Sequence, residues 1–225
     1  MQLKALYTAI HKLNDIDKAL IFLYLDFVGF IRHYVGHKVK WLWYFHMTHH
    51  LATRLTPLTR TREHPVYHIY SMSTRVLLAY PGSVFIFSLV GANSGASDFV
   101  ALVLALVLFQ FNLHIRHTPF RVSYGALEVF LMSPFMHQVH HSKLSKHHDK
   151  NFGVALSIWD RLAGTLYVPL EDEELIFGVE TPFKESGQIT SGFHDLMLPY
   201  FLIKEDLVKS GIVRSDLNLK KNSNF

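Results

Sequence analysis

The sequence predicts an all-α protein: an integral membrane helical bundle in which a transmembrane or re-entrant hairpin carries a histidine-rich, metal-binding cap on its cytoplasmic side. Two long apolar runs separated by a turn predict the hairpin. Histidines clustered at helical spacing predict the cap, and Lys- and Arg-rich segments on either side of the apolar runs predict its location. A length of 225 residues allows one domain with a sizeable core.

The amino-acid composition restricts the kinds of metal site and binding partner that the chain can have. The chain has 16 histidines and no cysteine, so disulfides, iron–sulfur clusters and thiolate metal sites are excluded. Any metal must therefore be bound by imidazole and carboxylate. The net charge is +4 while 49% of residues are hydrophobic, which fits a basic face beside a membrane better than a nucleic-acid-binding domain. The first twenty residues contain no pattern of a cleavable signal.

The first apolar run is "ALIFLYLDFVGFI", Ala19 to Ile31, which contains one charged residue, Asp26. A helix of this length covers about 20 Å, less than the roughly 30 Å of a bilayer core. Two interpretations follow: a buried helix with a functional acid, or the inner end of a longer membrane helix that begins near Leu13.

The hairpin is predicted from Val76 to Val90, a run broken by Pro81-Gly82, and from Phe99 to Phe111. The segment between them, "GANSGASD", has the composition of a turn. An antiparallel hairpin returns its two open ends to the same side, so the histidine-rich segments before and after it can meet. A buried hairpin in a soluble protein is the alternative.

Positive charge predicts the orientation. The segments 32–75 and 116–150 are both rich in Lys and Arg, whereas the turn has neither. The positive-inside tendency therefore places both histidine segments in the cytoplasm.

Three histidine clusters have the spacing of one helix face: "HYVGH", "HMTHH" and "HQVHH". Residues three and four apart share a face of an α-helix, and neutral imidazole is a good ligand for iron or zinc. Eight such residues exceed what one tetrahedral zinc ion uses. They fit two neighbouring metals, or one metal with an elaborate outer shell of histidines. The eight clustered residues are His33, His37, His46, His49, His50, His137, His140 and His141.

The remaining histidines have weaker patterns. His114 and His117 follow the second apolar run, where either can complete a metal site, and His64 is balanced between a site-adjacent and a structural role. The charged run "KLSKHHDK" predicts a solvated face for His147 and His148. Surface positions are expected for His11, His68 and His194.

These motifs resemble the fatty acid hydroxylase and sterol desaturase superfamily of membrane di-iron oxygenases. The three clusters stand in that family's order, and "LWYFHMTHH", "TREHP" and "DKNFGVALSIWDRLAGTLY" are similar to its linked motifs. The resemblance runs from about Asp26 to Tyr167 and selects His117 over His114 as a further ligand. It implies two iron ions, O₂ as co-substrate, and hydroxylation or desaturation of an unactivated C–H bond in a lipid.

The chain also departs from that family. It begins almost at the first cluster, where relatives commonly carry more membrane helices, and it has Leu113 where some relatives have another histidine. Ala163 stands where a Phe is frequent, a change interpreted as packing. The resemblance divides the chain into an N-terminal segment with the start of a membrane helix (1–25), the di-iron domain (26–168) and a cytoplasmic extension (169–225).

Outer-shell residues and partners complete the expectations. Carboxylates commonly orient ligand imidazoles through the second ring nitrogen. The candidates are Asp26, Asp149 and Asp160, with Asn151 as a further polar neighbour, against rival roles in capping or ion pairs. The chain has no dinucleotide fingerprint or haem domain, so electrons must come from a separate reductase and a ferredoxin or cytochrome b5-type carrier. No nucleic-acid partner is expected, and the location is the bacterial inner membrane or the endoplasmic reticulum.

Two other function classes fit the sequence less well. A metal transporter or storage protein is one alternative, but a transporter would place polar residues inside its spans, and Phe99 to Phe111 contains only Gln110. A zinc hydrolase would need a general base such as that of a His-Glu-x-x-His helix, and the sequence has none.

Overall fold

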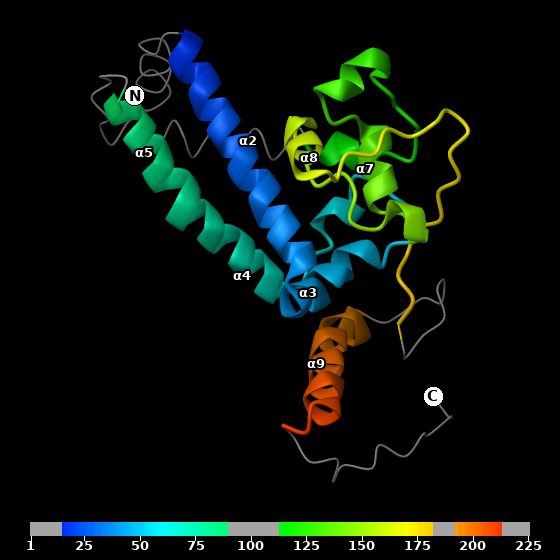
Figure 1. The fold of residues 1–225 in the computed structure, drawn as a ribbon. Helices are drawn as coiled ribbons and strands as arrows, with labels where there is room; N and C mark the ends of the chain where they lie inside the picture. Colours follow the sequence, from blue (N-terminus) through cyan, green and yellow to red (C-terminus); the bar gives the residue numbers. More distant parts are fainter. Residues whose placement is uncertain (1–14, 90–112, 182–191, 213–225) are drawn as a thin grey trace.

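The computed structural model describes residues 15–89, 113–181 and 192–212 (Figure 1). In these segments the chain is helical, as predicted, and two isolated β-bridges, Leu131–Leu156 and Ser142–Phe177, occur among the described residues. The longer helices are α2 (Asp15–Lys38), α3 (Lys40–His50), α4 (Pro65–Thr74), α5 (Tyr80–Leu89), α7 (Pro134–His140), α8 (Ile158–Ala163) and α9 (Gly192–Lys209). Short helical turns connect them: η1 (Thr59–Thr61), η2 (Arg75–Ala79), η3 (Leu113–His117), η4 (Gly125–Val129) and η5 (Ser145–His147).

Helix α2 is longer than the apolar run that predicts it. It has 24 residues, or about 36 Å, and it continues beyond Ile31 through His33 and His37. Among the described residues, the stretch Ala19–Lys38 of α2 is the one helix long and apolar enough to cross a membrane. A core helix of a soluble protein meets the same criteria, but α2 also presents large apolar side chains outward: Leu20, Phe22, Leu23 and Phe27.

The first half of the predicted hairpin is not broken at Pro81. Helix α4, the π-helical turn η2 and helix α5 follow one another without a gap from Pro65 to Leu89. Proline lacks the N–H for a normal helical hydrogen bond, and its ring crowds the preceding turn. The wider π turn directly before Pro81 accommodates this irregularity within the helix. The second half of the hairpin, Phe99 to Phe111, lies outside the described residues.

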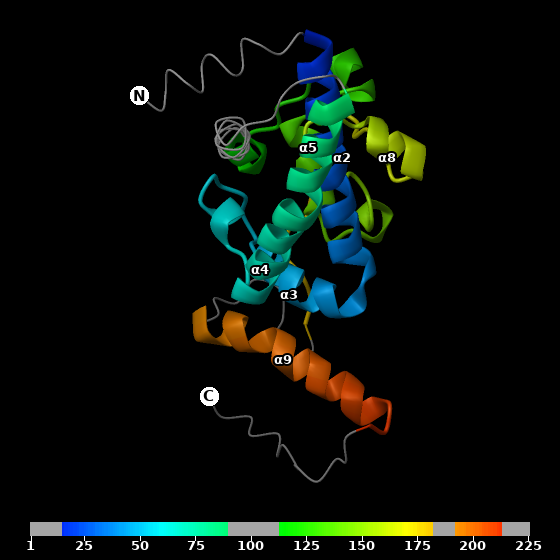
Figure 2. The ribbon, with the colours of Figure 1, turned by 90° about the vertical axis from the view of Figure 1, so that its left-hand side faces the viewer.

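Helices α2 and α4–α5 lie side by side, and both views show them rising together from the end that carries α3 (Figures 1 and 2). The Tyr24 hydroxyl donates a 2.7 Å hydrogen bond to the Leu78 carbonyl across this contact. Gly82 permits the approach, because a Cβ there would lie 2.0 Å from the Tyr24 hydroxyl oxygen. The outward side of the second helix is apolar as well: Val76, Leu77, Leu78 and Phe85 are exposed.

Helix α9 closes the opposite end of the molecule by packing on α3. A small core of Tyr44, Met47, Leu198 and Leu202 joins the two helices. The Tyr44 hydroxyl also donates a 2.6 Å hydrogen bond to Asp206. This packing fixes the orientation of α3, the helix that carries the second histidine cluster.

The loop at residues 151–157 is clamped between α2 and α8 by two buried carboxylates. Asp26 accepts hydrogen bonds from the backbone N–H groups of Ala155 and Leu156 and from the Trp159 indole, at 2.8–3.1 Å. Asp160 accepts 2.8 and 2.6 Å hydrogen bonds from the N–H groups of Phe152 and Gly153. Because these groups are buried, each carboxylate satisfies donors that would otherwise be costly to desolvate.

Gly153 supplies a test of this clamp. A Cβ at this position would lie 2.4 Å from the Leu156 carbonyl oxygen and 2.8 Å from a carboxylate oxygen of Asp160. We expect Gly153→Ala to lower the free energy of unfolding by about 1–3 kcal/mol, because the loop has no room to relax. Thermal unfolding in detergent measures the change. Gly192→Ala, which enters open space, is the matched control, and equal melting of both variants would contradict a rigid loop.

Candidate metal centre

Nine buried or nearly buried imidazoles converge in the interior where α2, α3, η3 and α7 meet. They form two groups, and within each group one nitrogen per residue lies within 4.8 Å of the others. The first group is His33, His37, His46, His50 and His140, and the second is His49, His117, His137 and His141. These are the eight residues of the three clusters together with His117.

The two groups cut across the sequence clusters. On α3, His46 and His50 belong to the first group while His49 belongs to the second. On α7 and at its C-cap, His140 belongs to the first group, whereas His137 and His141 belong to the second. Helices α3 and α7 therefore each contribute histidines to both groups. The groups touch where the rings of His50 and His141 stack with centroids 4.4 Å apart.

The nitrogens of the first group have the environment that a metal ion would complete. In the described part of the chain, Nε2 of His37, His50 and His140 is buried without a hydrogen-bond partner. Leaving a buried polar atom unpaired costs about 1–3 kcal/mol, and native proteins rarely tolerate several together. Imidazole nitrogens are ligands for iron and zinc, so the donor set fits a transition metal.

The second group converges more tightly. Nε2 of His117 and Nε2 of His141 each lie 3.1 Å from Nε2 of His137. Three ring nitrogens from η3 and α7 therefore point toward one location. His49 of α3 stands beside them, with ring centroids 4.8 Å from those of both His117 and His141.

The second ring nitrogens of two histidines in the first group are fixed by the backbone. Nδ1 of His33 donates to the Phe152 carbonyl, and Nδ1 of His140 donates to the Lys150 carbonyl, both at 2.9 Å. A carbonyl only accepts, so Nδ1 carries the hydrogen and Nε2 keeps its lone pair. Both rings are thereby held in the tautomer that can bind a metal through Nε2.

His137 has a different partner. The Arg116 guanidinium donates a 2.6 Å hydrogen bond to its Nδ1 and further bonds to the carbonyls of Gly153 and Val154. Burial lowers the pKa of Arg116 to about 9, so the side chain remains a cation at neutral pH. Sequence reasoning missed Arg116, although its position directly before His117 places it at the site.

The residues expected to orient imidazoles through their side chains contact other groups. Asp26 and Asp160 bind the loop backbone, as described above. Asn151 bonds to the carbonyls of Met136 and Tyr167, and Asp149 pairs with Lys38 at 2.6 Å. The carboxylates hold the loop at 151–157, and the Phe152 carbonyl of that loop holds His33.

Other histidines lie outside the two groups. His64 is buried, where its Nδ1 accepts from the Val66 N–H and its Nε2 donates to the Leu196 carbonyl, linking α4 to α9. His147 is buried beside Glu173 and Tyr167, in contrast to the predicted solvated face, while His148 is exposed as expected. His68 is exposed and His194 half-buried. His114 lies in η3, and His11 lies outside the described residues.

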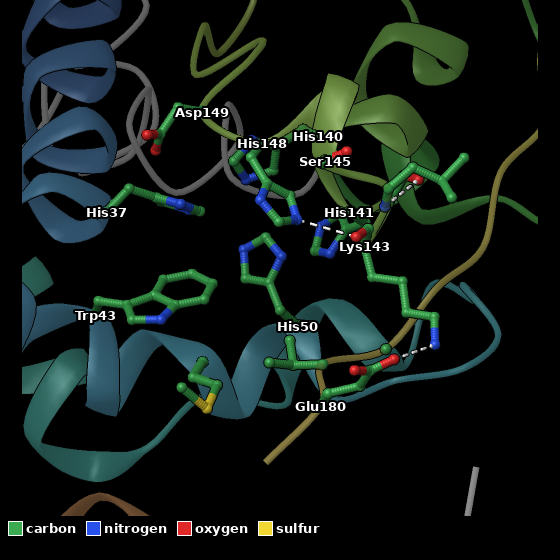
Figure 3. Close-up of a pocket in the computed structure, with 15 residues that line it drawn as sticks. His37, Trp43, His50, His140, His141, Lys143, Ser145, His148, Asp149 and Glu180 are labelled. Carbon is green, nitrogen blue, oxygen red and sulfur yellow. Dashed lines mark hydrogen bonds and ion pairs between the residues drawn. The ribbon is translucent and has the colours of Figure 1, made fainter. Parts of the chain in front are cut away.

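A cavity of about 640 Å³ opens onto both groups (Figure 3). Three histidines of the first group and one of the second line it: His37, His50, His140 and His141. A small molecule in this cavity would therefore lie beside both ligand sets.

Comparison with known proteins shows similarity to a lipid-oxidising family and to several of its characterised members. The sequence profile described as fatty acid hydroxylase matches residues 18–165. Human alkylglycerol monooxygenase is 30% identical over 178 residues, which cover 78% of this chain and 36% of that protein. The Xenopus tropicalis alkylglycerol monooxygenase is 31% identical over 168 residues, covering 72% of this chain and 33% of that protein. The ornithine lipid hydroxylase OlsE of Rhizobium tropici is 26% identical over 170 residues, covering 75% and 45%.

The chain thus spans between a third and a half of the length of these curated relatives. No solved structure matches it significantly.

The buried imidazoles predict an acid-sensitive metal-free protein. Burial lowers the pKa of His49 to about 3 and that of His140 to about 4, against an ordinary value of 6.5. Between pH 6.5 and 4 both groups take up protons in the unfolded chain but not in the folded one. The contribution of these two groups to the free energy of unfolding is therefore complete above pH 6.5. It decreases by about 2.7 kcal/mol for each pH unit as the pH is lowered from 6.5 toward 4.

Denaturant unfolding of chelator-treated protein at pH 7, 6 and 5, followed by circular dichroism, measures this loss. A free energy of unfolding that stays constant over this range would mean that the imidazoles are solvated.

Proposed function

The chain belongs to the fatty acid hydroxylase family, and from this premise we propose that it is an O₂-dependent lipid hydroxylase or desaturase with a histidine-bound pair of iron ions. The observation that carries the proposal is the convergence of nine imidazoles into two adjoining groups. In the overall hydroxylation, one oxygen atom of O₂ enters a C–H bond and the other leaves as water, consuming two electrons and two protons. Desaturation instead removes two hydrogens from the lipid, and with the same two electrons and two protons both oxygen atoms of O₂ leave as water.

The proposed ligands are the two groups of histidines already defined, one group for each ion. When bound, the two ions would supply the O₂ activation needed to oxidise an unactivated C–H bond. The chain contributes the orientation of the rings: the carbonyls of Phe152 and Lys150 fix the tautomers of His33 and His140. Burial lowers the pKa of His49 and His140 and so keeps these imidazoles neutral at pH 7.

A lipid substrate is supported by the relatives and by the apolar exterior. The relatives' names specify alkylglycerols and ornithine lipids, which are chains with polar headgroups. The outward faces of α2 and of η2–α5 carry large apolar residues, which fits a protein embedded in the membrane from which its substrate comes. The lysine- and arginine-rich segments favour a cytoplasmic location for the histidines.

The first test combines metal analysis with lipid analysis. We expect the purified protein to bind two iron ions per chain and His141→Ala to bind at most one, because that ring belongs to the second group. His68→Ala, which removes an exposed histidine, is the matched control and should keep both ions.

Comparative lipid mass spectrometry of cells with and without the protein gives the reaction. A gain of about 16 mass units indicates hydroxylation and a loss of about 2 indicates desaturation. Bound metal without any oxidised lipid would instead support a storage or transport protein.

Electron supply gives a further test. We propose a ferredoxin or cytochrome b5-type carrier with its reductase as donor, docking at the basic face of the cap through an acidic surface. Because such encounters are steered by charge, turnover with limiting carrier should fall several-fold between 50 and about 300 mM salt. Turnover with a small chemical reductant is the control and should change little. Equal salt dependence of the two would exclude electrostatic docking.

A further inference from the structure

Tyr67 of α4 packs directly against the first histidine group. Its ring stacks on that of His46, with the ring centroids 4.2 Å apart and the ring planes inclined by 28°. This separation is smaller than the 4.8–5.3 Å between His46 and the four histidine rings around it. Both residues are buried, and Tyr67 is completely so. The tyrosine is therefore part of the immediate surroundings of a proposed ligand, although it lies outside the three histidine clusters.

His46 lacks the hydrogen bond that fixes two other rings of its group. His33 and His140 each donate from Nδ1 to a backbone carbonyl. Among the described residues, His46 has no hydrogen-bond partner at either ring nitrogen, and both nitrogens are buried. Without such a bond, the orientation of the ring before a metal binds depends on packing. The stacked ring of Tyr67 supplies that packing.

Two contacts fix the start of α4, and with it the position of Tyr67. His64 caps the first turn of α4 and donates a 3.0 Å hydrogen bond from Nε2 to the Leu196 carbonyl of α9. One turn beyond Tyr67, Arg32 of α2 donates a 2.7 Å hydrogen bond to the Ser71 hydroxyl. Figures 1 and 2 show the start of α4 beside the junction of α2 and α3. The stacked ring is therefore held from both α2 and α9.

Gly36 provides the space for the far end of the Tyr67 ring. A Cβ at Gly36 would lie 2.4 Å from the hydroxyl oxygen of Tyr67 and 3.0 Å from the nearest ring carbon. Gly36 stands between His33 and His37 in α2, so the hydroxyl lies against the helix that carries both histidines. Within the described part of the chain, this buried hydroxyl has no hydrogen-bond partner. The contact with the histidine group is therefore made by the ring and not by a hydrogen bond from the hydroxyl.

We propose that Tyr67 is a positioning residue for the metal ion of the first group: its ring holds the His46 imidazole so that one nitrogen faces the other histidines of that group. The inference rests on the proposed function and goes beyond it by assigning an orienting residue outside the histidine clusters. His64, which precedes Tyr67 in the sequence, contributes by fixing the start of α4. Because this role requires the ring alone, phenylalanine should replace tyrosine at this position.

The role is tested by titrating the chelator-treated chain in detergent with Co²⁺, whose visible spectrum reports the ligand geometry. We expect the parent protein to bind two ions. Tyr67→Leu should bind one of them about tenfold more weakly and with a changed spectrum, because an orienting neighbour of a ligand is lost. Tyr67→Phe keeps the stacked ring and should match the parent protein in affinity and spectrum. If Tyr67→Leu matches the parent protein, or if Tyr67→Phe is as weak as Tyr67→Leu, the stacking role is wrong.

A matched control separates metal binding from general stability. Tyr24→Leu removes another tyrosine that joins α2 to the following helices, through its hydrogen bond to the Leu78 carbonyl. Both leucine variants should melt at a lower temperature than the parent protein, as measured by circular dichroism, but only Tyr67→Leu should lose affinity for Co²⁺. Equal losses of affinity in the two variants would mean that Tyr67 acts through overall stability, and the positioning role would fail.

Gly36→Ala tests the same contact from the side of α2. Alanine favours a helix over glycine, so a loss of metal affinity would come from displacement of the Tyr67 ring and not from weakening of α2. We expect Gly36→Ala to weaken one Co²⁺ site about tenfold. The double variant with Tyr67→Leu should be no weaker than Tyr67→Leu alone, because both changes remove one contact. A Gly36→Ala variant that binds like the parent protein, or losses that add in the double variant, would overturn the proposal.

The parent protein separates this inference from the function on which it rests. If the parent protein binds two ions and the variants at Tyr67 and Gly36 bind them equally well, the positioning role fails and the proposed function stands. A parent protein that binds no transition metal would overturn both.

Discussion

The structure depends on burying nine imidazoles whose nitrogens point at one another. Each unpaired buried nitrogen costs about 1–3 kcal/mol, and seven such atoms lie on six of these nine rings. Their sum is comparable to the entire stability of an ordinary domain, about 5–15 kcal/mol. Other interactions must therefore offset this cost for the helices to remain packed together. A bound metal ion would satisfy one nitrogen on each ring, because neutral imidazole has one lone pair, and it would couple its binding free energy to folding.

The remaining architecture supports the rings through an intermediate layer. The buried carboxylates Asp26 and Asp160 do not touch imidazole; they bind the N–H groups of the loop at 151–157. That loop then presents the Phe152 carbonyl to His33, and its neighbour Lys150 presents a carbonyl to His140. A backbone carbonyl cannot change its protonation state, so it fixes the tautomer of its partner more permanently than a carboxylic acid would. The loop therefore transmits the rigidity of α2 and α8 to the ligands.

Sequence patterns predict the parts of this site that depend on local geometry. Spacings of three and four residues place His46, His49 and His50 on one helix stripe, and the structure has all three on α3 facing the interior. The division of that stripe between two groups depends on how α3 is rotated, which the packing of α9 fixes and no local pattern encodes. Burial of His147 likewise depends on Glu173, 26 residues away, and the charged neighbours of His147 give no sign of it. The continuity of the helix through Pro81 depends on a π turn that helix-breaking rules do not anticipate.

Arg116 is a buried positive charge that interacts with the same loop and the same two carboxylates. A buried cation beside prospective ligands of positive ions is electrostatically unfavourable, and burial alone lowers its pKa. The attraction of Asp26 and Asp160 opposes this effect, so the two carboxylates that clamp the loop also hold the guanidinium in its charged form. The guanidinium in turn bonds to the carbonyls of Gly153 and Val154, within the same loop. Loop geometry, the orientation of His137 and the charge balance of the interior are therefore one coupled network, and removing either carboxylate disturbs all three.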